Sequence, residues 1–216
     1  MYAALDPKLT WYVSRASGLV TWTLCAAAIL WGLVLSSKLI RRRGLPAWLL
    51  DLHRYLGTLA LVFCGIHVTA LVADSYVHFS WREVLLPMAS QWRPGAVAWG
   101  VVSMYLLIAI QVTSALRSRI SKRVWHTIHL SSFLLFGAGS IHGIRSGADW
   151  TNRFVQYGAV SVIGLVIFAT AVRLTFRPKA RPAIRPVEPV DPVIRQPVGT
   201  PVFETHGFEA PQGVPR

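Results

Sequence analysis

The chain has 216 residues, of which 53% are hydrophobic and only 14% are charged, and its mean hydropathy is +0.46. Soluble domains ordinarily carry about a quarter of charged residues, so this composition argues against a soluble protein and favours a membrane protein. The net charge of +13 would suggest nucleic acid binding in a soluble chain, but the basic residues gather beside the ends of apolar runs, so no nucleic acid partner is expected.

Five uncharged, mostly apolar runs are long enough to cross a lipid bilayer. A helix rises about 1.5 Å per residue, so roughly 20 residues cover a hydrocarbon layer of roughly 30 Å. The runs are Ala16–Ser37, Tyr55–Ala73, Gly95–Leu116, Val124–Ile144 and Phe154–Val172. The predicted fold class is therefore an all-α membrane protein built as a five-transmembrane-helix bundle. A soluble protein with fully buried helices is the alternative, which five such runs in one small chain disfavour.

Two segments outside these runs can be assigned from the same pattern. Residues 1–15 are predicted to form an outer N-terminal arm, and they lack the basic region and short apolar core of a cleavable signal peptide. The segment from Ser75 to Pro94 is too polar to span the membrane. Its spaced apolar residues fit either a short helix in the outer interface or a plain loop, and both interpretations stay open.

The composition changes abruptly after Phe176. Nine of the thirteen prolines lie between Pro178 and Pro215, and large apolar residues are few there. Such a segment cannot bury enough surface to fold, so residues 177–216 are predicted to be a disordered cytoplasmic tail that follows a transmembrane domain over residues 16–176. The tail is too short for a flavin or nucleotide domain, so we expect no flavin bound by this chain.

The distribution of basic residues predicts how the bundle is oriented in the plasma membrane. Sixteen of the 22 Lys and Arg residues lie in the loops after the first and third runs or from Arg173 onward. Cytoplasmic loops carry an excess of Lys and Arg. Both loops and the C-terminus are therefore expected in the cytoplasm, and the N-terminus outside.

Five of the seven histidines lie in or beside the second and fourth runs. His53 and His67 are fourteen residues apart, a rise of roughly 21 Å and a rotation about 40° short of whole turns, so they share a face at two depths. His129 and His142 are thirteen residues apart. Both helices cross the membrane in the same direction, so His53 levels with His129 and His67 with His142. Each level then offers two facing imidazoles, as a six-coordinate b-type haem requires.

The second spacing does not fit a regular helix. Thirteen residues leave His129 and His142 about 140° apart in rotation, so either the helix is irregular or the two side chains use different rotamers. His126 leaves a similar angular error and lies nearer the basic loop. Three glycines could permit a kink, namely Gly137, Gly139 and Gly143.

The residues around these histidines resemble a known family. The pattern Leu52-His53-Arg54 with His67 fourteen later, then Trp125-His126-Thr127-Ile128-His129 with His142 thirteen later, is similar to the ferric reductase-like transmembrane domain. That superfamily includes ferric reductases, the membrane cores of NADPH oxidases and the haem-binding subunit of the bacterial methionine sulfoxide reductase system. The resemblance covers roughly residues 15–176.

This resemblance implies two stacked, bis-histidyl b-type haems whose irons take histidines as axial ligands. His53 and His129 would hold the inner haem, and His67 and His142 the outer one. His129 rather than His126 is implied as the ligand, because the family's histidine follows the tryptophan by four residues.

Other positions qualify what the resemblance implies. Arg54 near the inner level and Arg145 near the outer level are candidates for binding haem propionates, although membrane topology explains their positions equally well. Oxidase members of the family carry further histidines one turn on either side of the outer ligand, where this chain has Phe63 and Leu71. An outer site that reduces oxygen is therefore not expected.

The expected function is one-electron transfer across the membrane, from a cytoplasmic flavoprotein or quinol donor to an extracytoplasmic acceptor such as ferric iron. The chain would then be an oxidoreductase component that needs a separate electron donor. One alternative is a haem-binding subunit that delivers electrons to a partner reductase on the outer face, as in methionine sulfoxide repair. Another, ranked lower, is a haem-free proton or ion pathway through the histidines.

Overall fold

The computed structural model describes residues 7–36, 47–74 and 79–175 of the chain. Within these ranges all regular structure is helical, and they contain no strand. The tail predicted over residues 177–216 lies outside the described residues, as do the first six residues of the predicted arm.

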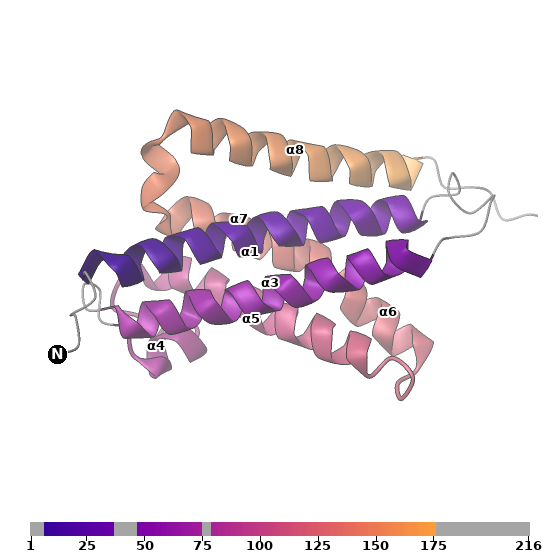
Figure 1. The fold of residues 1–216 in the computed structure, drawn as a ribbon, viewed down its shortest axis with the longest axis horizontal. Helices are drawn as coiled ribbons and strands as arrows, with labels where there is room; N and C mark the ends of the chain where they lie inside the picture. The colour runs from indigo at the N-terminus through magenta and orange to yellow at the C-terminus, as the bar shows by residue number, and fades with distance from the viewer. Residues whose placement is uncertain (1–6, 37–46, 75–78, 176–216) are drawn as a thin grey trace, which may run out of the picture. The chain divides into compact units, whose positions relative to one another are not determined.

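The chain folds into long helices joined by short connections (Figure 1). The helices are α1 (Pro7–Ser36), α3 (Ala47–Ala73), α4 (Trp81–Leu85), α5 (Pro94–Ala115), α6 (Lys122–Leu130), α7 (Ser132–Ser146), the 3₁₀ turn η1 (Ala148–Thr151) and α8 (Arg153–Thr175). Five spans in the described part of the chain are long and apolar enough to cross a membrane, and α6 and α7 together form one of them. Each predicted run is thus a helix, and the prediction of an all-α, multi-pass membrane protein is confirmed.

The first helix begins earlier than its apolar run. α1 starts at Pro7, so most of the segment expected to be an arm is helical. Proline suits the first helical position because an N–H there would have no partner inside the helix. The hydroxyl of Thr10 donates to the Asp74 carboxylate at 3.0 Å, which ties the start of α1 to the residue that follows α3. Lys8 and Arg15 interrupt the apolar pattern, which is why hydropathy alone places the helix too late.

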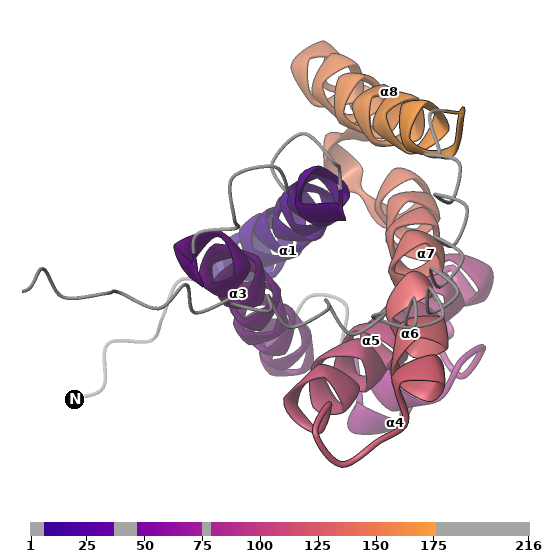
Figure 2. The same cartoon turned by 90° about the vertical axis from the view of Figure 1, so that its right-hand side faces the viewer.

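Two helix pairs make up most of the bundle. α1 packs along α3 and α5 along α7, and α8 packs beside α1. Viewed end-on, the α1–α3 pair faces the pair formed by α5 and the α6–α7 span (Figure 2). The start of α1, the end of α3 and α4 lie at one end of the bundle, called here the α4 end. The opposite end, where α6 begins, is called the α6 end.

The fourth span is broken between its two histidines. α6 ends at Leu130 and α7 begins at Ser132, with Ser131 between them. The Ser131 hydroxyl donates to the Ile128 carbonyl at 2.6 Å, and its backbone N–H also reaches that carbonyl at 3.1 Å. A serine that bonds back to a preceding carbonyl bends a helix. Of the two alternatives left open by the spacing, an irregular helix is therefore present. The break is at Ser131, before the glycines Gly137, Gly139 and Gly143 that the sequence offered as places for a kink.

The segment between the second and third spans contains a short helix, which settles the alternatives left open by the sequence. α4 follows Ser80, whose backbone N–H donates to the Glu83 carboxylate at 2.8 Å. This reciprocal cap satisfies a donor that a five-residue helix could not satisfy itself. Phe79 and Val84 are buried against Val97 and Val101 of α5, which fixes α4 to the bundle.

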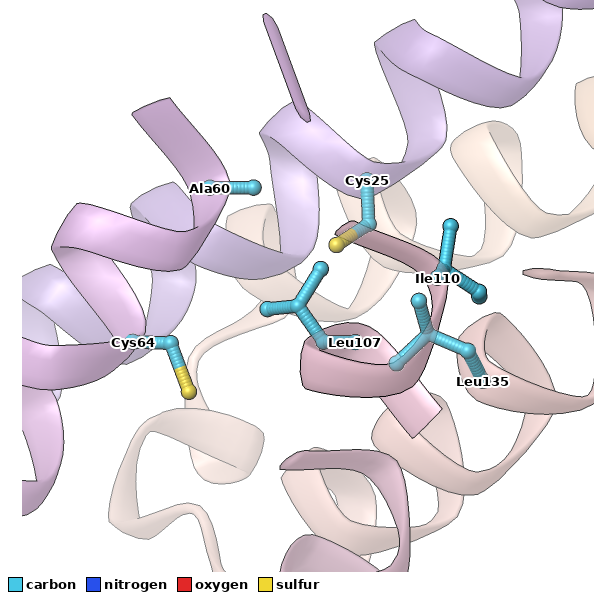
Figure 3. Packing of buried hydrophobic residues seen from close by; sticks show 6 residues of the cluster. All are labelled: Cys25, Ala60, Cys64, Leu107, Ile110 and Leu135. Carbon is cyan, nitrogen blue, oxygen red and sulfur yellow. The ribbon is translucent and has the colours of Figure 1, made fainter. Parts of the chain in front are cut away.

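Buried apolar side chains of several helices form a cluster (Figure 3). It is formed by Cys25, Ala60, Cys64, Leu107, Ile110 and Leu135, which come from α1, α3, α5 and α7. Both cysteines are free and buried. In chain order, the α3 members lie between His53 and His67, and Leu135 lies between His129 and His142, so the cluster lies between the levels of the two histidine pairs.

The outward surface is apolar as well. Phe154, Ile167 and Phe168 of α8 are 89%, 63% and 66% exposed. A helix that is apolar on its outer faces is stable only against other protein or lipid. These side chains suit the hydrocarbon of a bilayer.

Candidate haem site

The structure brings the four membrane histidines together as two pairs. The ring centroids of His53 and His129 are 5.9 Å apart, and those of His67 and His142 are 6.3 Å apart. In each pair one ring comes from α3 and the other from the α6–α7 span. These are the pairs that the spacing along the chain predicts.

The two pairs lie toward opposite ends of the bundle. His53 is near the start of α3 and His129 lies in α6, so this pair belongs to the α6 end. His67 is near the end of α3 and His142 near the end of α7, so that pair belongs to the α4 end. The fourteen residues along α3 correspond to a rise of roughly 21 Å. The pairs are therefore separate sites rather than one cluster.

Glycines on the neighbouring helices make room for three of the histidines. A Cβ atom added to Gly18 of α1 would lie 2.9 Å from Nδ1 of His67, and one added to Gly32 would lie 3.3 Å from Cε1 of His53. Gly18 and Gly32 are fourteen residues apart, and so are His53 and His67. Because α1 and α3 run in opposite directions, the first glycine faces the second histidine and the second glycine faces the first. α1 and α3 thus meet in a register that places a glycine opposite each histidine.

A glycine of α5 makes room for a histidine in the same way. A Cβ atom on Gly100 would lie 2.7 Å from Nδ1 of His142, which is closer than real Cβ contacts come. The imidazole is packed directly against the backbone of the neighbouring helix. An alanine at this position would therefore have to displace the ring.

The pair at the α4 end is oriented by hydrogen bonds from Nδ1. His67 Nδ1 lies 2.6 Å from the carbonyl of Ser14, and His142 Nδ1 lies 2.8 Å from the carbonyl of Ala96. A carbonyl only accepts, so each Nδ1 carries the proton and donates it, and the lone pair of the neutral ring is on Nε2. Metal-binding histidines ordinarily have this arrangement, with one nitrogen anchored and the other free for the metal.

The pair at the α6 end lacks such bonds. Nδ1 of His53 and Nδ1 of His129 are both buried without a hydrogen-bond partner. The indole of Trp125 instead stacks on His129, with centroids 4.9 Å apart and an angle of 22° between the planes. His126 is exposed and its nearest ring contact is Trp125, at 6.3 Å. Of the two α6 histidines, His129 is the one that faces His53.

A cavity of about 500 Å³ surrounds the pair at the α4 end. This volume lies within the usual range of roughly 300–1,000 Å³ for ligand and cofactor sites. Its walls are mostly apolar and come from α1, α3, α5, α7 and α8, with smaller parts from α4 and η1. Arg15 is a charged residue of the lining, and its Nε donates to the Asp149 carboxylate at 2.9 Å. The cavity thus combines two imidazoles, an apolar wall and an ion pair.

The arginines expected to bind propionates are placed differently from Arg15. Arg145 is exposed and is not part of the cavity wall, and its carbonyl accepts a hydrogen bond from Arg93 at 2.6 Å. Arg54 is exposed beside Asp51, with 3.3 Å between Nη1 and Oδ1. The structure therefore brings neither guanidinium into the described cavity, although Arg54 is adjacent to His53 in the chain.

The histidine pairs fit a haem in two respects. An iron between two imidazoles, each bound at about 2.0 Å as in other metal–imidazole bonds, would hold the ring centres about 6 Å apart. The observed separations of 5.9 and 6.3 Å agree with that span. Second, each pair supplies two imidazoles that face each other. Two imidazoles suit a metal that brings its remaining ligands with it, as iron in a porphyrin does.

Sequence reasoning missed several residues of these sites. Gly18, Gly32 and Gly100 carry no chemistry, but the spacing of the first two mirrors that of His53 and His67, and this signal could have found them. Arg15 was assigned to a loop because α1 was expected to start later. With α1 starting at Pro7, Arg15 is one turn before Gly18 and on its face.

A family model described as Ferric reductase like transmembrane component matches residues 17–140. The matched region contains His53, His67 and His129 and ends two residues before His142. No curated protein and no solved structure matches the chain. The family match covers more than half of the chain and includes four of its five membrane spans at least in part, and the helical bundle agrees with it. The chain therefore belongs to the ferric reductase-like transmembrane family.

Proposed function

We propose that this protein passes single electrons across the membrane through two b-type haems, one held by His53 and His129 and the other by His67 and His142. The observation that carries the proposal is the pair of facing imidazoles at each end of a membrane-spanning bundle. A single site would serve binding or catalysis at one surface. Two sites joined by the same two spans suit transfer from one surface to the other.

The haem would supply the one-electron chemistry, and the chain would bind, orient and insulate it. The carbonyls of Ser14 and Ala96 hold His67 and His142 with Nε2 available to the iron. Gly18 and Gly100 allow these rings to lie against the neighbouring helices. The mostly apolar wall would lower the polarity around the haem, and Arg15, which is paired with Asp149, would place a guanidinium within reach of a propionate.

The middle of the bundle favours electrons over protons. A proton relay needs a chain of ionisable or hydrogen-bonding side chains across the membrane. The cluster of Cys25, Ala60, Cys64, Leu107, Ile110 and Leu135 stands between the two histidine pairs and offers aliphatic groups and two thiols. Electron tunnelling needs no polar path, so side chains of this kind are compatible with electron transfer between the two pairs.

The charges suggest the direction in which the bundle is oriented. Arg117, Arg119, Lys122 and Arg123 are exposed at the α6 end. By the positive-inside rule, this end is cytoplasmic. We propose that a flavoprotein docks on this basic end, or a quinol arrives from the lipid, and that the acceptor at the α4 end is ferric iron or a partner reductase.

The test is the haem content of the purified protein. We expect a pyridine haemochrome assay to give two b-type haems per chain and a low-spin absorption spectrum, as six-coordinate iron requires. H53A and H67A should each lose one haem. A fully folded wild-type protein that takes up no haem would refute the proposal.

Electron transfer itself is tested in sealed vesicles. Wild-type protein is reconstituted with a ferric chelate inside and a reduced quinol or flavin outside. Reduction of the enclosed iron is expected with wild-type protein and not with H67A. Equal rates for H67A and wild type would show that the electrons take another path.

A further inference from the structure

The two histidine pairs are held in different ways. At the α4 end both rings are anchored through Nδ1, to the carbonyls of Ser14 and Ala96. At the α6 end Nδ1 of His129 is buried without a partner. A ligand whose second nitrogen is free can rotate about its Cβ–Cγ bond, so something else has to orient this ring.

Trp125 lies where such a support is needed. It precedes His129 by four residues, so both side chains lie on one face of α6. The indole covers the imidazole at 4.9 Å with the planes 22° apart, a stacked arrangement. The indole Nε1 of Trp125 is buried without a hydrogen-bond partner, so the ring is held by its ring contacts and not by a hydrogen bond from Nε1.

The other contact of Trp125 is a cation. The guanidinium carbon of Arg117 lies 4.6 Å from the centroid of the Trp125 ring. A cation at this distance is attracted by the electrons of an indole. Arg117, Trp125 and His129 thus form a continuous series from the exposed turn after α5 to the histidine pair at the α6 end.

We propose that Trp125 is a positioning residue for His129. Its indole fixes the plane of the imidazole in place of the missing Nδ1 hydrogen bond, and it brings the charge of Arg117 close to the site. The inference rests on the proposed function, because it concerns how His129 meets a haem.

The proposal has a consequence for the reduction potentials of the two sites. A hydrogen bond from Nδ1 to a carbonyl makes an imidazole a stronger electron donor to iron, which stabilises the ferric state. His67 and His142 have this bond and His129 does not. The charge of Arg117 near His129 favours the reduced state further. The haem at the α6 end should therefore have the higher potential of the two, so that in the proposed direction the acceptor at the α4 end, rather than the order of the two haem potentials, would draw the electrons outward.

The experiment compares W125F, W125L and R117Q with wild type in the haem-loaded protein. W48L is the matched control, because Trp48 is also near the α6 end but its ring contacts Trp31 rather than a histidine. The readouts are haem per chain, the low-spin electron paramagnetic resonance signals, which report the orientation of the axial imidazoles, and a spectroelectrochemical titration.

We expect W125L to shift or lose one of the two low-spin signals, while W125F, which keeps an aromatic face, and W48L resemble wild type. R117Q should keep both haems and lower the potential of one of them. W125L with wild-type signals and potentials would overturn the proposal. W125F behaving like W125L would also overturn it, because an aromatic face at this position would then not be enough to orient His129. If W125L does not fold, the proposal is tested by the signals of W125F and by the haem potentials of R117Q.

The failure of this inference differs from failure of the proposed function. A wild-type protein without haem would refute both. A wild-type protein with two haems, combined with unchanged signals in W125L, would refute the role of Trp125 alone.

Discussion

The position of the His142 ring depends on the missing side chain of Gly100. A Cβ atom on Gly100 would lie 2.7 Å from Nδ1 of His142. The same nitrogen donates a hydrogen bond to the carbonyl of Ala96, which is on the same helix as Gly100. We expect G100A to displace the imidazole, break this hydrogen bond and lower the haem content at the α4 end. The assay is haem per chain together with the low-spin signal.

G95A is the control for this prediction. Gly95 is on the same helix, and a Cβ atom there meets nothing within 4 Å. It should keep both haems. Two haems and unchanged signals in G100A would show that the close packing at Gly100 does not matter for ligation.

The different positions of His126 and His129 predict that only His129 is needed to bind a haem. His129 faces His53 at 5.9 Å, whereas His126 is exposed. H129A should lose one haem and H126A should keep both, as measured by the haemochrome ratio. Equal losses in the two variants would contradict the assignment.

At the scale of elements, α4 depends on one carboxylate. The backbone N–H of Ser80 donates to Glu83 at 2.8 Å, and the N–H of Gln91 reaches the same carboxylate at 3.4 Å. These bonds favour the charged form, chiefly that from Ser80, and hold the pKa of Glu83 below its ordinary value. The carboxylate therefore stabilises α4 above the ordinary carboxyl pKa, and this contribution is lost as the pH falls through the lowered pKa.

We expect backbone hydrogen exchange in residues 81–85, corrected for intrinsic rates, to show reduced protection at acidic pH. E83Q is the matched variant, because its amide oxygen still accepts from Ser80 but does not titrate over this range. Its protection should vary less with pH. Identical pH profiles for Glu83 and the glutamine variant would exclude the cap as the cause.

The break at Ser131 is the other element-scale feature with a functional consequence. On a regular helix, thirteen residues would leave His129 and His142 about 140° apart. The separation into α6 and α7 allows both rings to face α3, at 5.9 and 6.3 Å from their partners. One serine hydroxyl bonded to Ile128 marks the place where this change of direction occurs.

At the scale of the whole molecule, the distribution of charge predicts the orientation in the membrane. S121C places a thiol at the N-cap of α6, in the basic turn, and Q91C places one at the exposed α4 end. Cys25 and Cys64 are buried, so they should contribute little labelling. In intact cells we expect a membrane-impermeant thiol reagent to label Q91C and not S121C. The reverse pattern would invert the proposed topology.

The helices and their order could be predicted from the hydropathy of neighbouring residues in the sequence. Hydropathy depends on neighbours in the chain, because a span must carry its own apolar surface through the lipid, and all five spans were predicted from it. The pairing of His53 with His129 followed from spacing and from the direction of each span. The late start assigned to α1 has the same origin, because Lys8 and Arg15 lower the hydropathy of a segment that is nevertheless helical.

The class of fold, the five spans and the histidines able to meet can be predicted from the sequence, because each depends on local composition or on the regular rise of a helix. What surrounds those histidines depends on how the helices pack. The contacts of Gly18 with His67 and of Gly100 with His142 join residues more than forty positions apart. Such contacts depend on the register and rotation at which two helices pack, which many side chains set together. Orientation of the imidazoles, the place of Arg15 in the cavity and the stack on His129 are therefore properties of the packed bundle.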